Sequence, residues 1–126
     1  MRILLDTHIA LWVIAGSDRI NPIRDVIMKD ENDIYISTAS WWELAIKIST
    51  GKFKGKLSEI RVAAKKSGFI ELPVTGDHTE SVLKLPPIHK DPFDRMLVAQ
   101  AMSEPMRLIT VDSKLETYSE LVWKIK

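Results

Sequence analysis

The sequence predicts a single α/β domain with three layers, in which helices cover both faces of a central, mainly parallel sheet of about five strands. Its 126 residues suit one domain with a core of its own. Short apolar runs alternate with segments in which apolar residues recur at the helical period. Strands that are separated by helices pair in parallel through right-handed crossovers. We find no repeat, low-complexity tract or linker that would divide residues 1–126.

Five segments have the length and apolar content of buried strands. In chain order they are Arg2–Leu5, Asp33–Ser37, Phe69–Leu72, Arg107–Val111 and Leu121–Ile125.

Start and stop signals mark helices between these strands. The first helix is expected over residues 7–15, because Gly16 follows it. Asn21-Pro22 places a capping side chain before a proline at the first helical position, and this predicts a helix that reaches about Lys29.

The rest of the chain carries four more helix signals. Ser40 is a candidate cap for a helix that Gly51 ends. Residues 58–67 form the next predicted helix, and Gly68 is its C-terminal stop.

A shorter helix is expected over residues 75–83, because Leu85-Pro86-Pro87 then stops it. Asp91 caps the last predicted helix. That helix begins at Pro92 and runs to about Met102.

The composition favours a cytoplasmic protein. There is no cysteine, which excludes disulfides and thiolate zinc sites and fits a reducing compartment. Arg2 and the apolar run after it resemble the start of a signal peptide, but Asp6 breaks the run early. Residues 9–15 are too short to cross a bilayer, so we expect no membrane association.

A basic segment runs from residue 47 to residue 66. Its seven basic residues face a single acid, Glu59, whereas the whole chain has a net charge of only +1. The basic residues are Lys47, Lys52, Lys54, Lys56, Arg61, Lys65 and Lys66. A solvated helical hairpin and a local nucleic-acid contact both explain this segment. Lys52, Lys54 and Lys56 are the candidates for contacts with phosphate.

Four acidic residues carry the functional signal of the chain: Asp6, Glu43, Asp94 and Asp112. Three of the four stand next to a short apolar run or open a predicted helix. In an α/β sheet those positions lie at the carboxyl edge of the strands, where ligands usually bind. We therefore expect the four carboxylates to gather at this edge.

Such a cluster requires a counter-ion. Two unit negative charges about 5 Å apart repel by roughly 3 kcal/mol at an effective dielectric of 20. Mg²⁺ and Mn²⁺ prefer carboxylate and water oxygens, and they can polarise a phosphoryl oxygen and position an attacking water. The pattern indicates a metal-dependent enzyme that uses water as its nucleophile.

Each of these residues also has a structural interpretation. Asp6 can cap the first helix, and Glu43 can pair with Lys47 four residues later. Asp94 suits the first turn of a helix because of the helix dipole, and Asp112 suits a turn.

The aromatic and imidazole side chains give weaker signals. The spacing of Trp12, Trp41 and Trp42 among apolar residues favours the core or a dimer interface over base stacking. The three histidines are too scattered for a zinc motif such as His-Glu-x-x-His: His8, His78 and His89.

At these residues the chain resembles a PIN domain, and within that family the VapC-type toxin ribonucleases of bacterial toxin–antitoxin pairs. The main matching pieces are Leu4-Leu5-Asp6-Thr7-His8, Ser40-Trp41-Trp42-Glu43-Leu44-Ala45-Ile46-Lys47, Leu85-Pro86-Pro87-Ile88-His89-Lys90-Asp91-Pro92-Phe93-Asp94-Arg95 and Leu108-Ile109-Thr110-Val111-Asp112. They follow the family order over almost the whole chain, and Asp91-Pro92-Phe93-Asp94-Arg95 is the most specific of them.

The resemblance implies an endoribonuclease that uses Mg²⁺ or Mn²⁺. Its catalytic and metal-binding residues would be the acidic quartet, Asp6, Glu43, Asp94 and Asp112. Thr110 matches a hydroxyl position near that site, and Arg95 is a candidate for a phosphate contact or for orienting a carboxylate. The resemblance also implies a homodimer and a cognate antitoxin protein. A structure-specific DNA nuclease and a catalytically silent PIN-fold binding module remain as alternatives.

Overall fold

The computed structural model describes residues 1–125, and within them five strands form one parallel sheet in the order β3-β2-β1-β4-β5. The strands are β1 (Arg2–Leu5), β2 (Asp33–Ser37), β3 (Ile70–Leu72), β4 (Arg107–Thr110) and β5 (Val122–Lys124). All five predicted strands are confirmed to within one residue at each end.

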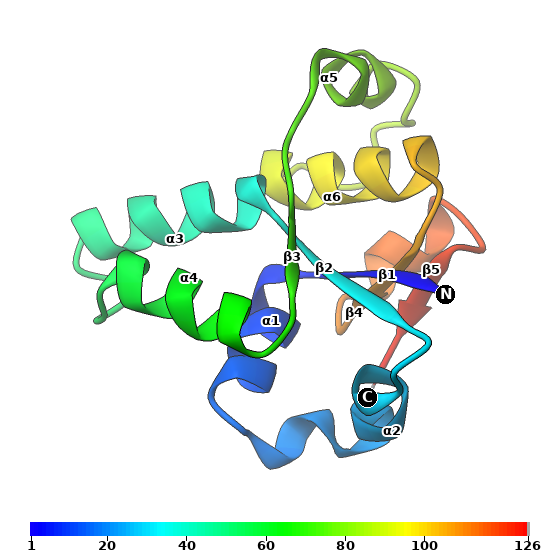
Figure 1. Ribbon diagram of the computed structural model, residues 1–126. Coiled ribbons are helices and arrows are strands. Elements are labelled where there is room, and N and C mark those ends of the chain that lie inside the picture. Colours follow the sequence, from blue (N-terminus) through cyan, green and yellow to red (C-terminus); the bar gives the residue numbers. More distant parts are fainter. Residues whose placement is uncertain (126) are drawn as a thin grey trace.

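Helices lie on both faces of the sheet, so the predicted three-layer α/β/α class is confirmed (Figure 1). The α-helices are α1 (Thr7–Ile14), α2 (Arg24–Met28), α3 (Thr38–Ser49), α4 (Leu57–Lys66), α5 (Gly76–Val82) and α6 (Pro92–Ser103). Two 3₁₀ helices, η1 (Asp18–Ile23) and η2 (Ser113–Thr117), complete the connections.

The core is divided by the sheet into two apolar clusters. Ile3 and Leu5 of β1 point to the face that α1, α2, α3 and α4 cover, whereas Leu4 points to the face that α6 covers. All three side chains are fully buried. Because alternate residues of a strand face opposite sides, a strand buried on both faces reads as a continuous apolar run.

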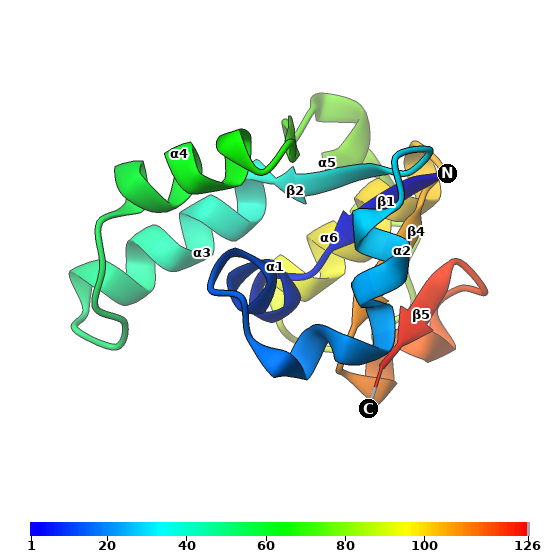
Figure 2. The ribbon, with the colours of Figure 1, turned by 60° about the horizontal axis from the view of Figure 1, so that its bottom comes forward.

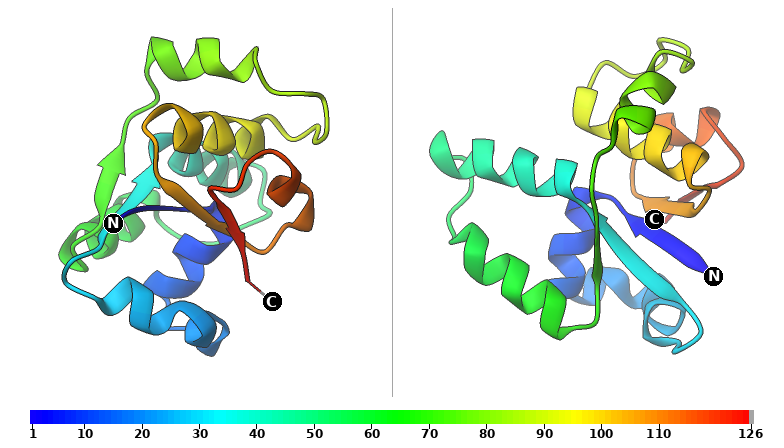
Figure 3. Two further views of the ribbon diagram at one scale, coloured as in Figure 1. Left: turned by 90° about the vertical axis from the view of Figure 1, so that its right-hand side faces the viewer. Right: turned by 45° about the horizontal axis from the view of Figure 1, so that its top comes forward.

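Two pairs of helices extend the layers. Helices α3 and α4 lie side by side as a hairpin that projects beyond the sheet, as both Figure 1 and Figure 2 show. Helix α5 packs on the outer side of α6 (Figure 3). None of the helices in residues 1–125 is long and apolar enough to cross a bilayer.

Most predicted helix boundaries are confirmed. Asp91 caps α6, and its carboxylate accepts hydrogen bonds from the amides of Phe93 (2.8 Å) and Asp94 (3.2 Å). The stops at Gly16 and Gly68 are confirmed as well, since their φ angles of 68° and 87° lie in the left-handed region that favours glycine.

The predicted helix start at Asn21-Pro22 is wrong. Ser17 is instead the cap of η1, the 3₁₀ helix that precedes α2. Its hydroxyl accepts a hydrogen bond from the Arg19 amide at 3.2 Å. The Asn21 side chain accepts from the Arg24 guanidinium at 2.9 Å, and α2 begins only at Arg24.

The predicted cap at Ser40 is also wrong. Ser37, the last residue of β2, caps α3 by accepting a hydrogen bond from the Ala39 amide at 3.0 Å. Ser40 lies buried inside the first turn, where its hydroxyl is 2.9 Å from that of Thr7.

The strand order places a topological switch between β1 and β4. The chain passes from β1 to β2 on one side, and from β3 it crosses over to β4 on the other side. In open α/β sheets the crevice at such a point is the usual ligand site. Leu5 pairs with Ile109 in the register, and the Asp6 amide donates to the Ile109 carbonyl at 3.0 Å. The residues that follow β1 and β4 are therefore held beside each other.

Candidate metal centre

The four predicted acidic residues stand at this carboxyl edge or on helices that begin there. Asp6 directly follows β1, and Asp112 comes two residues after β4. Asp94 lies in the first turn of α6, and Glu43 in the second turn of α3.

Asp6 is held by donors on both of its oxygens. Oδ1 accepts from the Ile9 amide at 2.9 Å, which makes Asp6 the cap of α1, and Oδ2 accepts from the Thr110 hydroxyl. The Thr110 oxygen in turn accepts from the Asp112 amide at 3.1 Å. Thr110 therefore ties the end of β1 to the end of β4. Burial raises the pKa of the Asp6 carboxyl above its usual value.

Glu43 is joined to the same edge through Thr7. The Thr7 hydroxyl donates to Oε1 at 2.7 Å, and the Lys47 ammonium lies 3.4 Å from Oε2. The Glu43 side chain is buried, so these two groups satisfy a carboxylate that water barely reaches. The predicted pairing with Lys47 is confirmed.

Asp94 experiences the charge of its acidic neighbours. Burial is the largest cause that raises the pKa of this carboxyl to about 7, and the negative charge of Asp91 is the next. The charges of Asp6 and Glu43 act in the same direction, whereas His89 opposes them. A carboxyl that shares a half-buried space with like charges holds its proton to higher pH. The expected repulsion within the cluster is thus present at Asp94.

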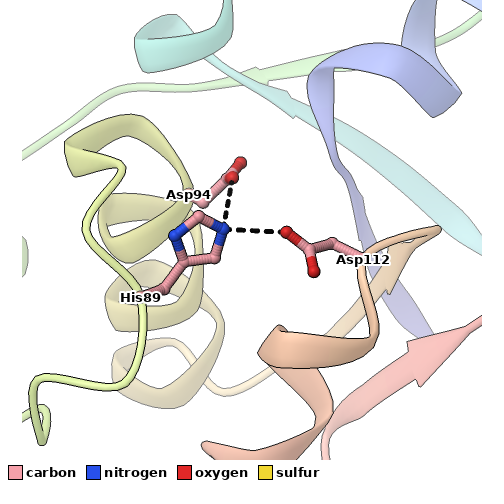
Figure 4. Close-up of side chains that lie close together, drawn as sticks. All are labelled: His89, Asp94 and Asp112. Carbon is pink, nitrogen blue, oxygen red and sulfur yellow. Dashed lines mark hydrogen bonds and ion pairs between the residues drawn. The ribbon is translucent and has the colours of Figure 1, made fainter.

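His89 connects Asp94 to Asp112 (Figure 4). Its Nε2 atom lies 2.8 Å from Oδ2 of Asp112 and 3.3 Å from Oδ2 of Asp94. Oδ1 of Asp112 accepts from the Lys114 amide at 2.9 Å. Partial burial raises the pKa of Asp112, but the hydrogen bonds from Lys114 and His89 outweigh it and hold that pKa below its usual value.

Sequence reasoning missed His89. The scattered histidines gave no zinc spacing, and that observation directed attention away from all three. One signal was nevertheless present: His89 stands two residues before Asp91, at the edge of the most specific block of the sequence.

Arg95 contacts backbone carbonyls and a tyrosine hydroxyl. Nη1 donates to the Pro86 carbonyl at 3.0 Å and lies 3.1 Å from the Tyr118 hydroxyl, and Nη2 donates to the Val82 carbonyl at 3.4 Å. The Tyr118 hydroxyl also accepts from the His89 amide at 2.8 Å. The guanidinium therefore fixes the segment before α6.

The basic residues proposed for phosphate contacts lie in the loop between α3 and α4. Lys52, Lys54 and Lys56 are all exposed. Lys52 lines a mostly apolar cavity of about 660 Å³ together with Thr7 and Lys47, the two residues that contact Glu43.

The tryptophans divide between core and surface. Trp41 is buried in the core, as its spacing predicts. Trp42 is 64% exposed, and its ring contacts that of Phe93 edge to face, with centroids 5.0 Å apart.

The donor set of this edge fits a hard divalent cation. The charges of Asp6, Glu43 and Asp91 influence the pKa of Asp94, and one oxygen of Asp94 and one of Asp112 meet at His89. Mg²⁺ and Mn²⁺ bind such oxygens with one or two carboxylates and leave other positions for water or phosphate. A cation would also offset the two causes that raise the pKa of Asp94, its burial and the negative charges of its neighbours.

The chain matches the PIN domain family model over residues 3–121. Ribonuclease VapC22 of Mycobacterium tuberculosis (strain ATCC 25618 / H37Rv) is 23% identical over 118 residues, which are 92% of this chain and 91% of that protein.

Solved structures of the same fold include chains from three organisms. A chain of VapBC2 from Rickettsia felis, bound to a DNA fragment from its promoter, superposes on this chain with a TM-score of 0.73 at 18% identity. The superposition covers 98% of each chain. A toxin–antitoxin complex from Klebsiella pneumoniae has a TM-score of 0.66 at 21% identity and covers 98% of this chain and 99% of that one. A domain of a functionally unknown protein from Methanocaldococcus jannaschii DSM 2661 has a TM-score of 0.61 at 18% identity, and 99% of this chain and 91% of that chain are covered.

Proposed function

The chain belongs to the PIN domain family, and from this premise we propose that it is a metal-dependent endoribonuclease, the toxin of a toxin–antitoxin pair. The reaction is the hydrolysis of RNA phosphodiester bonds at the carboxyl edge of the sheet. The observation that carries the proposal is the set of four acidic side chains, Asp6, Glu43, Asp94 and Asp112, which reach this edge from four separate segments. The similarity to a protein named as a ribonuclease supports RNA as the substrate.

The four carboxylates are the proposed ligands of Mg²⁺ or Mn²⁺ and the catalytic residues. When bound, the cation supplies positive charge to the phosphoryl group. The protein provides the rest. The carboxylates orient the attacking water, Thr110 fixes Asp6, and Thr7 fixes Glu43, each through a hydroxyl that donates to one oxygen. Because these hydroxyls are buried, the two carboxylates are oriented before substrate arrives.

The cavity beside Glu43 is the proposed path of the RNA strand. It leads from Thr7 along α1 to Lys52 in the α3–α4 loop. Lys54 and Lys56 extend the positive charge of that loop, and such contacts position a strand without reading its sequence. We assign Arg95 a structural role, since its guanidinium is engaged with the segment before α6.

Joint replacement of Lys52, Lys54 and Lys56 by alanine is expected to weaken RNA binding at low salt. If the three lysines contact phosphates of a single strand, the plot of log association constant against log salt concentration becomes less steep by about 2. Fluorescence anisotropy with the Asp94→Asn protein, which leaves the RNA intact, measures both quantities.

A matched variant removes three other exposed lysines. Lys65, Lys66 and Lys84 carry the same total charge but lie outside the loop. If both triple variants reduce the salt dependence of RNA binding equally, the α3–α4 loop makes no specific phosphate contact and is a solvated hairpin.

We also propose a cognate antitoxin, a homodimer and a cytoplasmic location. The similarity in fold to VapBC2 and to a toxin–antitoxin complex supports the antitoxin. The exposed Trp42, packed against Phe93, provides apolar surface for a second copy, and a chain without cysteine suits a reducing compartment. Light scattering on the purified chain measures the oligomeric state.

Incubation of the purified chain with total bacterial RNA tests the reaction. Discrete fragments are expected with Mg²⁺ or Mn²⁺ and none with EDTA. Cutting of branched DNA with intact RNA would instead identify a structure-specific DNA nuclease. No cleavage of either, together with no metal binding, would identify a silent binding module.

A further inference from the structure

We propose that His89 competes with the divalent cation for the carboxylates of Asp94 and Asp112. The imidazole holds the two side chains together in the metal-free protein and has to leave them when a cation joins them. This inference rests on the proposed function, because it concerns the same acidic edge.

The position of the ring is the first argument. One ligand atom from each of His89, Asp94 and Asp112 lies within 4.8 Å of the others, and Nε2 is 2.8 Å and 3.3 Å from the two carboxylate oxygens (Figure 4). Mg²⁺ would bind carboxylate oxygens at about 2.0–2.1 Å, so it would need the same two oxygens that accept from Nε2.

The second argument concerns the proton on the ring. The Asp91 amide donates a hydrogen bond to Nδ1 of His89 at 3.1 Å, so Nδ1 is an acceptor and carries no proton. A neutral imidazole with that arrangement has its hydrogen on Nε2. Nε2 is therefore a donor to Asp112 and Asp94, and it could bind a metal ion only if the ring hydrogen moved to Nδ1, where the Asp91 amide already donates.

The surrounding contacts hold the ring in this orientation. The His89 amide donates to the Tyr118 hydroxyl at 2.8 Å, and Arg95 lies 3.1 Å from the same oxygen. The Asp91 side chain is itself fixed as the cap of α6. The donor is thus presented to the two carboxylates by the fold, before any ligand binds.

The consequence follows from linkage. An interaction that exists in the metal-free protein and is broken on binding lowers the affinity for the metal ion by its own free energy. A hydrogen bond to a charged group is strong enough to change an affinity by about tenfold. His89 therefore holds Asp94 and Asp112 together in the metal-free protein, and by doing so it lowers their affinity for the cation.

His89→Ala is expected to bind Mn²⁺ about tenfold more tightly than the wild-type chain. Electron paramagnetic resonance of free Mn²⁺ measures the dissociation constant in the absence of RNA. The metal-free variant should also unfold at lower urea concentration, and saturating Mn²⁺ should reduce this difference. Ile88→Ala, at the exposed neighbouring position, controls for disturbance of the loop and should leave the affinity unchanged.

Weaker binding in His89→Ala would overturn the proposal and make the imidazole a metal ligand, and unchanged binding would overturn it as well. The proposed function is tested separately by the wild-type chain and Asp94→Asn. If the wild-type chain binds no Mn²⁺, both proposals fail. If it binds Mn²⁺ and Asp94→Asn does not, the result for His89→Ala concerns His89 alone.

Nitrogen NMR of the wild-type imidazole gives a second readout without a variant. The proposal expects the Nε2-protonated form in the metal-free protein and a hydrogen-bonded Nε2 proton that disappears when Mg²⁺ saturates the site. A Nε2 proton that persists unchanged at saturation would contradict it.

Discussion

Asp94→Asn is expected to lower the rate of RNA cleavage by more than about a hundredfold while the protein remains folded. Loss of a group that only supports a metal ligand typically costs 10–100-fold, and a ligand itself is expected to cost more. Asparagine has nearly the same shape, and the first turn of α6 keeps its cap from Asp91. Initial rates in Mg²⁺ and in Mn²⁺, with circular dichroism on the same samples, measure the activity and the fold.

Asp91→Asn is the matched control for this variant. It removes one negative charge from the same helical turn, and asparagine caps a helix as well as aspartate does. Cleavage should change by no more than a few-fold. A loss of the same size in both variants would mean that total charge near α6, and not a specific carboxylate of Asp94, supports the reaction.

The metal-free protein is expected to lose stability as the pH rises from about 4 to about 8. The pKa of Asp94 is raised from 3.8 to about 7 in the folded chain, so folding favours the protonated carboxyl. Its contribution is fully present below the unfolded pKa and is lost as the pH passes through the folded pKa. With allowance for the 24% exposure of this side chain, the loss is roughly 2–3 kcal/mol.

Other carboxyls modify this profile in predictable directions. The raised pKa of Asp6 adds to the loss at high pH, and the lowered pKa of Asp112 opposes it, because its contribution is lost as the pH falls. The contribution of Asp94 to the pH dependence of stability is the difference between the profiles of the wild-type chain and Asp94→Asn.

Urea unfolding in EDTA at pH 4 and at pH 8 measures the difference. The wild-type chain should be less stable than Asp94→Asn at pH 8, and the gap should close at pH 4. Saturating Mn²⁺ without EDTA should raise the stability of the wild-type chain at pH 8 but not that of Asp94→Asn. A wild-type chain that is more stable than the variant at pH 8 without metal would contradict repulsion at this edge.

The strands and the place of the candidate acidic residues at one edge of the sheet could be predicted from the sequence, because both depend on local patterns. The run Ile3-Leu4-Leu5 is apolar on both faces, and Asp6 follows it at the point where a buried strand has to emerge. The same holds for β4 and Asp112. Parallel pairing then brings such residues to one edge whatever the details of the loops.

The helix caps depended on information that the local sequence does not contain. Ser37 and Ser40 both precede apolar residues of α3, and either suits a cap. The end of β2 at Ser37 decides between them, and that end is fixed by its pairing with Leu72 on β3. Ser40 is then buried against Thr7, a residue 33 positions away.

His89 and Arg95 illustrate the same limit at the site. His89 meets Asp112 across 23 residues, and Arg95 meets Tyr118 across 23 residues. No sequence spacing relates His89 to Asp112 or Arg95 to Tyr118. Rules based on sequence spacing therefore do not detect these two contacts.

Calorimetric titration of the metal-free chain with Mn²⁺ at pH 7, in buffers of different ionisation enthalpy, tests the central claim most directly. We expect saturable binding that Asp94→Asn loses, with release of protons at pH 7, because burial and neighbouring charges raise the pKa of Asp94 to about 7. The release should vanish at pH 9. Absence of saturable binding, or equal binding by Asp94→Asn, would contradict the claim that these four carboxylates form a metal centre.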